Sequence, residues 1–126
     1  MLTLALVLAG LGALVHVYIF WLETVAFDTA GRRAFGVSVA DAATMRPWAF
    51  NQGFYNLFLA IGTTVGIAIS NSNRDAGLAL VLLGVGSMLA AAVVLISSDR
   101  SNARGAVVQG MFPAICLLLL AIWSWA

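Results

Sequence analysis

Long apolar stretches alternate with shorter polar segments along this chain. Four of the stretches contain about 20 mainly apolar residues, which is the length that a helix needs to cross a bilayer. Two polar segments are short, residues 70–75 and 97–105, and a third is longer, residues 23–46. The pattern predicts an all-α fold, an integral membrane four-helix bundle. It forms one four-span domain over residues 1–126, with spans at about residues 2–23, 47–69, 76–96 and 106–125.

Two prolines and one serine refine these elements. Pro47 opens the second span, where its missing N–H suits the first turn of a helix. Pro113 lies inside the fourth span and removes the hydrogen bond to the carbonyl of Gln109, so we expect a kink there. In the longest polar segment, residues 38–41 match a capping box. This match predicts a short helix after Ser38 that lies on the membrane surface.

The composition supports a membrane protein and excludes several other classes. Of the 126 residues, 63% are hydrophobic and only 9% are charged, against roughly 25% charged residues in soluble domains. The net charge of +1, with no basic run, excludes a nucleic-acid surface. The single Cys116 lies in an apolar stretch and there is only one histidine, so we expect no disulfide framework and no metal site. The residues identify no cofactor.

The arginines predict how the chain is oriented. The first and third loops contain five of the six basic residues, and the second loop contains only Arg74. The positive-inside rule therefore places loops 24–46 and 97–105 in the cytoplasm and both termini outside. The N-terminal stretch lacks a basic n-region and is too long for a signal peptide, so it is interpreted as a retained first span. All tryptophans lie near predicted span ends, as interfacial residues should: Trp21, Trp48, Trp123 and Trp125.

Polar side chains from three spans converge on the predicted cytoplasmic leaflet. His16 and Glu23 lie in the latter part of the first span, two turns apart on one helix face and about 10 Å apart along the axis. The outer halves of the spans contain only threonine, serine and glycine as exceptions to their apolar character. The other polar residues open the second span, Asn51, Gln52, Tyr55 and Asn56, and the fourth span, Gln109.

These residues predict a polar pocket that binds or transforms a small lipophilic molecule. His16 would be the general acid/base because imidazole titrates near neutrality, and Glu23 would orient it. The carboxamides and Tyr55 would bind the polar head of the ligand. The sequence does not separate an isomerase- or hydrolase-like intramembrane enzyme from a binding protein. The alternatives are a small oligomeric transporter or exporter, which the apolar outer leaflet disfavours, and a structural or accessory subunit.

Each of these residues also has a purely structural interpretation. Ionisable side chains within spans usually face the bundle interior and find partners there, so His16 is also explained as a buried histidine bonded to a neighbouring helix. Glu23 is also explained as a solvated residue beyond the membrane edge, and the carboxamides as hydrogen bonds between helices. Gly62 and Gly66 form a GxxxG match, which permits close packing within the bundle or between two copies in a homo-oligomer.

Several short motifs resemble a known family. They are residues 16–19, Leu22-Glu23, Phe35-Gly36, and above all residues 51–56 (NQGFYN) followed by Phe58-Leu59-Ala60. Together they resemble the small four-span bacterial membrane proteins of the domain of unknown function 1304 family, over essentially the whole chain. The resemblance implies a four-helix protein of the bacterial inner membrane, with His16, Glu23 and residues 51–56 in one recurring pattern. It implies no reaction and no ligand.

Overall fold

Four long helices make up most of the chain in the computed structural model, which describes residues 1–125. Each of the four is long and apolar enough to cross a membrane, which confirms the predicted all-α membrane four-helix bundle. Short helical turns occupy parts of the connections. In chain order the elements are α1 (Leu2–Glu23), the π-helical turn η1 (Phe27–Gly31), α2 (Arg32–Ala34), α3 (Val39–Ile69), α4 (Arg74–Ser98), the 3-10 turn η2 (Arg100–Asn102) and α5 (Ala103–Trp125).

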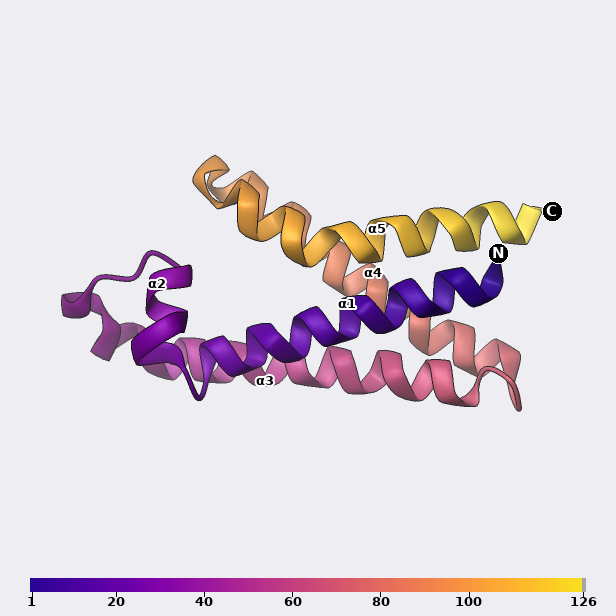
Figure 1. Cartoon of the computed structure of the whole chain (residues 1–126), viewed down its shortest axis with the longest axis horizontal. Helices are drawn as coiled ribbons and strands as arrows, with labels where there is room; N and C mark the ends of the chain where they lie inside the picture. The colour runs from indigo at the N-terminus through magenta and orange to yellow at the C-terminus, as the bar shows by residue number, and fades with distance from the viewer. Residues whose placement is uncertain (126) are drawn as a thin grey trace.

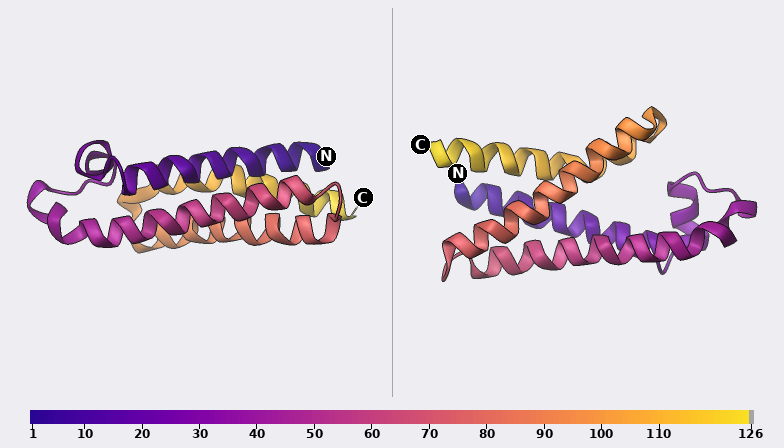
Figure 2. Two further views of the ribbon diagram at one scale, coloured as in Figure 1. Left: turned by 90° about the horizontal axis from the view of Figure 1, so that it is seen from below. Right: turned by 180° about the vertical axis from the view of Figure 1, so that it is seen from behind.

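The four long helices pack in a ring in which α1 contacts α3 and α5, and α4 contacts the same two helices from the opposite side. The chain termini lie together at one end of the bundle (Figure 1). We call this the terminal end, and it also holds the turn between α3 and α4. The loop end holds the connecting segment, residues 24–38, and η2. Toward the loop end, the ribbons of α4 and α5 diverge from those of α1 and α3 (Figure 2).

The helix predicted after Ser38 begins where the capping box places it, but it is not a separate surface helix. The Ser38 hydroxyl accepts a hydrogen bond from the Asp41 amide at 3.1 Å, and α3 then runs without a break from Val39 to Ile69. Pro47 therefore lies more than two turns inside α3 rather than in its first turn. Pro47 has no N–H, so the carbonyl of Ala43 loses its helical hydrogen-bond partner. Both residues are exposed, so this face of α3 does not pack against another helix.

The other two connections are tight and capped by polar side chains. Asn73 caps α4 by accepting a hydrogen bond from the Ala76 amide at 3.1 Å. Asp99 accepts a hydrogen bond from the Ser101 amide at 2.8 Å, at the start of η2. That backbone hydrogen bond favours the charged carboxylate and lowers the pKa of Asp99 below its usual value. Both turns are thus fixed by local contacts that the chain supplies within three residues.

Small residues bring the helices close together in the core. Lipid tails are as apolar as leucine, so helix association in a bilayer depends on close van der Waals packing. The buried threonine Thr63 packs directly against Gly84 of α4, where a Cβ atom would overlap its hydroxyl oxygen. The main apolar cluster combines small and medium-sized side chains from three helices: Ala5, Ala9, Val81, Val85, Met88, Cys116 and Leu120.

Gly62 and Gly66, the GxxxG pair of α3, have different surroundings. A Cβ atom on Gly66 would lie 2.8 Å from the carbonyl oxygen of Gly77 and 2.8 Å from Cβ of Leu80, so Gly66 packs against α4 of the same chain. A Cβ atom on Gly62 would meet nothing within 4 Å. Gly66 therefore serves the intrachain contact, and the structure gives no support to a homo-oligomer contact through Gly62 and Gly66.

Pro113 lies inside α5 and is buried against α1. A Cβ atom on Gly12 would lie 3.4 Å from Cδ of Pro113, so the glycine gives the proline ring its space. Figure 1 shows α5 changing direction partway along its length, as expected for a helix with an internal proline.

Gly62 and Gly66 of α3 provide a matched test of this packing. We expect Gly66→Ala to lower the melting temperature of the protein in detergent micelles, because its methyl group overlaps the backbone of α4; overpacking of this kind costs about 1–3 kcal/mol. Gly62→Ala should be neutral or raise the melting temperature slightly, since alanine is the better helix former. Equal destabilisation by both changes would contradict the intrachain assignment.

Candidate functional site

A hydrogen bond between Glu23 and Asn56 joins the loop ends of α1 and α3. The Asn56 side-chain amide donates to Oε2 of Glu23 at 2.7 Å and to the Gln52 carbonyl at 3.3 Å. Asn56 is buried and Glu23 is half-buried. No other hydrogen bond to the Glu23 carboxylate is found within residues 1–125. One oxygen of a partly desolvated carboxylate is thus held by a neutral donor.

The sequence around this pair explains the close approach of the two helices. A Cβ atom on Gly53 would lie 2.8 Å from Cγ2 of Thr24 and 3.1 Å from Cβ of Glu23. A side chain there would overlap Thr24 and crowd Glu23, so the glycine permits the close approach of α3 and α1. Beside this contact, Phe20 of α1 packs edge-on against Phe54, with ring centroids 5.3 Å apart.

A hollow of about 340 Å³ lies beside Glu23, between the end of α1, the connecting segment and the first part of α3. Three of its lining residues are polar, and the others are apolar or aromatic. The lining residues are Glu23, Asn51 and Gln52 together with Phe27, Phe35, Val37, Met45, Trp48 and Ala49.

The connecting segment forms one wall of the hollow because it folds back on the helices. Phe27 and Val37 are buried with Ala42 of α3 in a small second core. Gly31 is required in this fold, since a Cβ atom there would overlap the carbonyl oxygen of Leu22. Gly36 has a φ of 67°, a conformation that favours glycine, and it turns the chain into Ser38.

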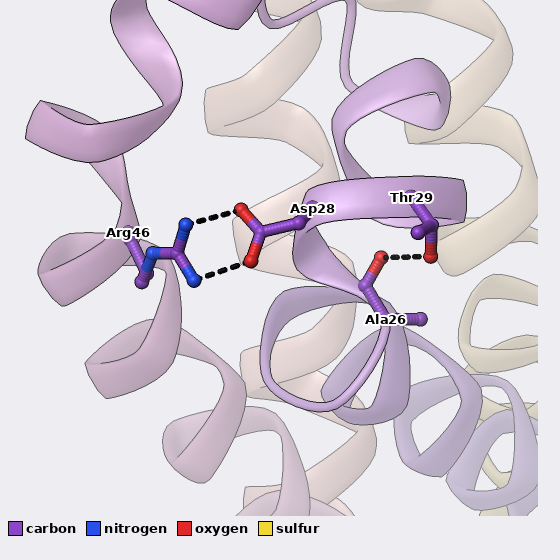
Figure 3. Close-up of polar contacts among 4 residues, drawn as sticks. All are labelled: Ala26, Asp28, Thr29 and Arg46. Carbon is purple, nitrogen blue, oxygen red and sulfur yellow. Dashed lines mark hydrogen bonds and ion pairs between the residues drawn. The ribbon is translucent and has the colours of Figure 1, made fainter.

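An ion pair fastens the connecting segment to α3. Both guanidinium amino groups of Arg46 donate to the two carboxylate oxygens of Asp28, as Figure 3 shows. The Thr29 hydroxyl donates to the carbonyl of Ala26 at 3.2 Å in the same turn. Arg46 and Asp28 are about half exposed, and an exposed pair of this kind stabilises a fold by only about 0.2–1 kcal/mol. Its effect is to orient the segment rather than to hold the protein folded.

The structure brings some of the predicted site residues together and separates others. Glu23 and Asn56 are bonded, and Asn51 and Gln52 line the hollow with Glu23. Asn51 and Gln52 are exposed rather than enclosed between helices. These residues were predicted to line a pocket between the first, second and fourth spans. In the structure they line a hollow beside α1 and α3 instead.

His16, Tyr55 and Gln109 do not line the hollow. His16 is only 1% exposed, and its Nδ1 lies 2.9 Å from the carbonyl oxygen of Gly12 in the same helix. Because a carbonyl only accepts, Nδ1 is the protonated nitrogen. Tyr55 is 58% exposed on the outside of α3, and Gln109 is half-buried on α5. The structure thus shows no direct contact between His16 and Glu23.

The aromatic walls of the hollow are absent from the sequence-based prediction. Phe27 and Phe35 belong to the connecting segment, and the sequence identifies Trp48 only as an interfacial residue. Trp48 is 75% exposed and Phe35 is 43% exposed, whereas Phe27 is buried. The sequence signal that could have identified these walls is the cluster of aromatic residues that flanks a polar loop. These residues come together only through the fold of η1, which the sequence pattern does not reveal.

The fold and this site define an integral membrane four-helix bundle with a polar cluster and a hollow at one end. The family model described as "Protein of unknown function (DUF1304)" matches residues 10–121. The chain therefore belongs to this family of unknown function, as its motifs predicted. Comparison with curated proteins and with solved structures gives no match.

The hydrogen bond between α1 and α3 can be tested with two asparagines of one helix. We expect Asn56→Ala to lower the melting temperature in micelles, because it leaves the half-buried Glu23 carboxylate without its donor. Hydrogen bonds between membrane helices contribute about 0.6 kcal/mol on average and up to about 1.7 kcal/mol. Asn51→Ala removes an exposed carboxamide and should leave the melting temperature unchanged. The same loss in both variants would contradict a specific role of Asn56.

Proposed function

We propose that this membrane protein binds a small lipophilic molecule with a polar head group in the hollow. The observation that carries the proposal is the half-buried Glu23 carboxylate at the wall of a mainly apolar hollow of about 340 Å³. Ligand sites are typically hollows of roughly 300–1,000 Å³ with apolar walls and a few polar groups that fix the orientation of the ligand. The hollow has both properties.

Each polar residue of the site takes a different role in this proposal. Glu23 contacts the head group of the ligand. Asn56 does not line the hollow, but its hydrogen bond positions the Glu23 carboxylate. Asn51 and Gln52 supply exposed carboxamides for further hydrogen bonds, and the apolar tail of the ligand packs against Phe27, Phe35 and Trp48.

Binding is favoured over acid/base catalysis by the position of His16. A general base must come within hydrogen-bond reach of the proton that it transfers, about 2.6–3.2 Å or one water molecule away. His16 is buried two turns deeper in α1 and its protonated nitrogen is engaged by Gly12. Tyr55 and Gln109 likewise lie away from the hollow. We therefore propose no catalytic step.

Binding is also favoured over transport by the apolar core. The buried cluster that extends to the terminal end contains alanine, valine, methionine, cysteine and leucine side chains, and a polar pathway would have to cross it. The arginines of the loop end support an orientation with this end in the cytoplasm of a bacterial inner membrane. In that orientation the hollow opens at the cytoplasmic leaflet, and both termini lie outside.

Photolabelling would test whether the hollow binds lipophilic molecules. The probe is hexadecanol with a diazirine on its tail, added to the protein in phosphatidylcholine nanodiscs. We expect adducts at Met45, Trp48 and Ala49 that excess unlabelled hexadecanol displaces, read by peptide mass spectrometry. Ala49→Phe fills part of the hollow and should reduce these adducts several-fold, whereas Ala43→Phe changes an exposed residue of α3 outside the hollow and should not.

Labelling spread evenly over exposed α4 residues such as Leu83 and Val94, with no displacement, would reject the hollow as a binding site. Equal labelling of the two phenylalanine variants would do the same.

The proposed orientation has its own test. We expect Ser101→Cys in the α4–α5 connection to react with a membrane-impermeant maleimide only after spheroplasts are lysed, and Ser72→Cys in the α3–α4 turn to react in intact spheroplasts. Cys116 is buried, so the unaltered protein provides the background. Labelling in the opposite order, measured by the gel shift of a polyethylene-glycol maleimide, would reverse the topology.

A further inference from the structure

The electrostatic character of the hollow is acidic, and this restricts the class of ligand. Glu23 is the only charged side chain among the lining residues. Its one hydrogen bond, from the neutral amide of Asn56, reaches a single carboxylate oxygen and brings no positive charge. A partly buried carboxylate without a cationic partner is costly in an apolar surrounding. A ligand that brings positive charge would supply the missing partner.

The basic side chains near the hollow make their hydrogen bonds with groups other than Glu23. Arg46 follows the lining residue Met45 in α3, but its guanidinium is paired with Asp28 through both carboxylate oxygens. Arg32 donates to the carbonyl of Val37 at 3.2 Å. Arg46 and Asp28 together form a neutral pair, and Glu23 is left as the one charged group that lines the hollow.

The aromatic residues give the same preference. Phe27, Phe35 and Trp48 all line the hollow, and the face of an aromatic ring attracts a cation, most strongly for tryptophan. Cages of aromatic rings are the usual surroundings of bound quaternary ammonium groups. The same rings can pack against an alkyl chain. One ligand with a cationic head and an apolar tail would therefore match both the carboxylate and the apolar residues of the hollow.

From these contacts we infer that the ligand of the hollow is a lipophilic monocation, an ammonium head group on an apolar tail. The inference rests on the proposed binding function and specifies its ligand. The ammonium group lies beside the Glu23 carboxylate and the aromatic residues of the hollow. Anionic amphiphiles are excluded by the carboxylate, and neutral ones leave its charge uncompensated.

The test compares three probes with the same tail and different head charge: decyltrimethylammonium, decanol and decyl sulfate. Binding is measured by isothermal titration calorimetry on the full chain in phosphatidylcholine nanodiscs, and the partitioning heat of empty nanodiscs is subtracted. We expect saturable binding of decyltrimethylammonium, at least about ten-fold tighter than that of decanol, which corresponds to one ion pair of modest strength at a partly buried site. Decyl sulfate should show no saturable binding.

Two variants assign the selectivity to named residues. Glu23→Gln keeps an oxygen that can accept the Asn56 hydrogen bond. It should weaken the binding of decyltrimethylammonium by about ten-fold and that of decanol by much less, because decanol is uncharged and forms no ion pair with Glu23. Asp75→Asn removes the same charge at the terminal end and is the matched control. Trp48→Leu changes a 75% exposed side chain, so the fold does not depend on it. This variant should weaken the binding of decyltrimethylammonium by a few-fold more than that of decanol, because leucine keeps an apolar contact for the tail but removes the aromatic ring.

The outcomes separate this inference from the proposed function. Equal affinity for decanol and decyltrimethylammonium, or unchanged affinity of the cation for the Glu23→Gln variant, would overturn the cationic ligand and leave the hollow as a binding site. Absence of saturable binding for all three probes would overturn both.

Discussion

Close contact between helix backbones is the constraint on which the other features of this protein depend. In lipid, burying leucine side chains brings little gain, so helices must approach closely enough for dispersion and hydrogen bonding to act. Gly66 provides this approach between α3 and α4, and Gly53 provides it between α3 and α1. The second contact has a chemical consequence, because it brings the Asn56 amide within 2.7 Å of Glu23. The polar cluster at the loop end is therefore a product of backbone packing.

The hollow arises from a different feature, the way in which the connecting segment returns over the first turns of α3. Its inner side is fixed by the small core around Phe27, and its outer side by the pair between Arg46 and Asp28. A surface loop with the same composition, but without this fold-back, would leave Glu23 facing water or lipid head groups. The site thus combines a wall from two helices with a wall formed by the connecting segment, which a small buried core and one exposed ion pair hold in place.

Much of the fold could be predicted from the sequence because a bilayer imposes simple rules on length and polarity. The four helices and the inward-facing Asn56 follow from those rules, and the helix start at Ser38 follows from its local capping box. The continuity of α3 through Pro47 and the turn η1 do not, since both are decided by local backbone contacts such as that of Gly31 with Leu22. His16 was grouped with Glu23 because they share a helix face, but two turns of depth give the pair different neighbours.

The length of α3 has a consequence for how a ligand would reach the hollow. At 1.5 Å per residue, its 31 residues span about 46 Å, which exceeds the roughly 30 Å hydrocarbon thickness of a bilayer. The first turns of α3, with Trp48 and Arg46, therefore extend into the head-group layer. An amphiphile already concentrated in that layer would meet the hollow by lateral diffusion. Occupancy would then follow its mole fraction in the leaflet, so a site with weak affinity by aqueous standards would still be filled.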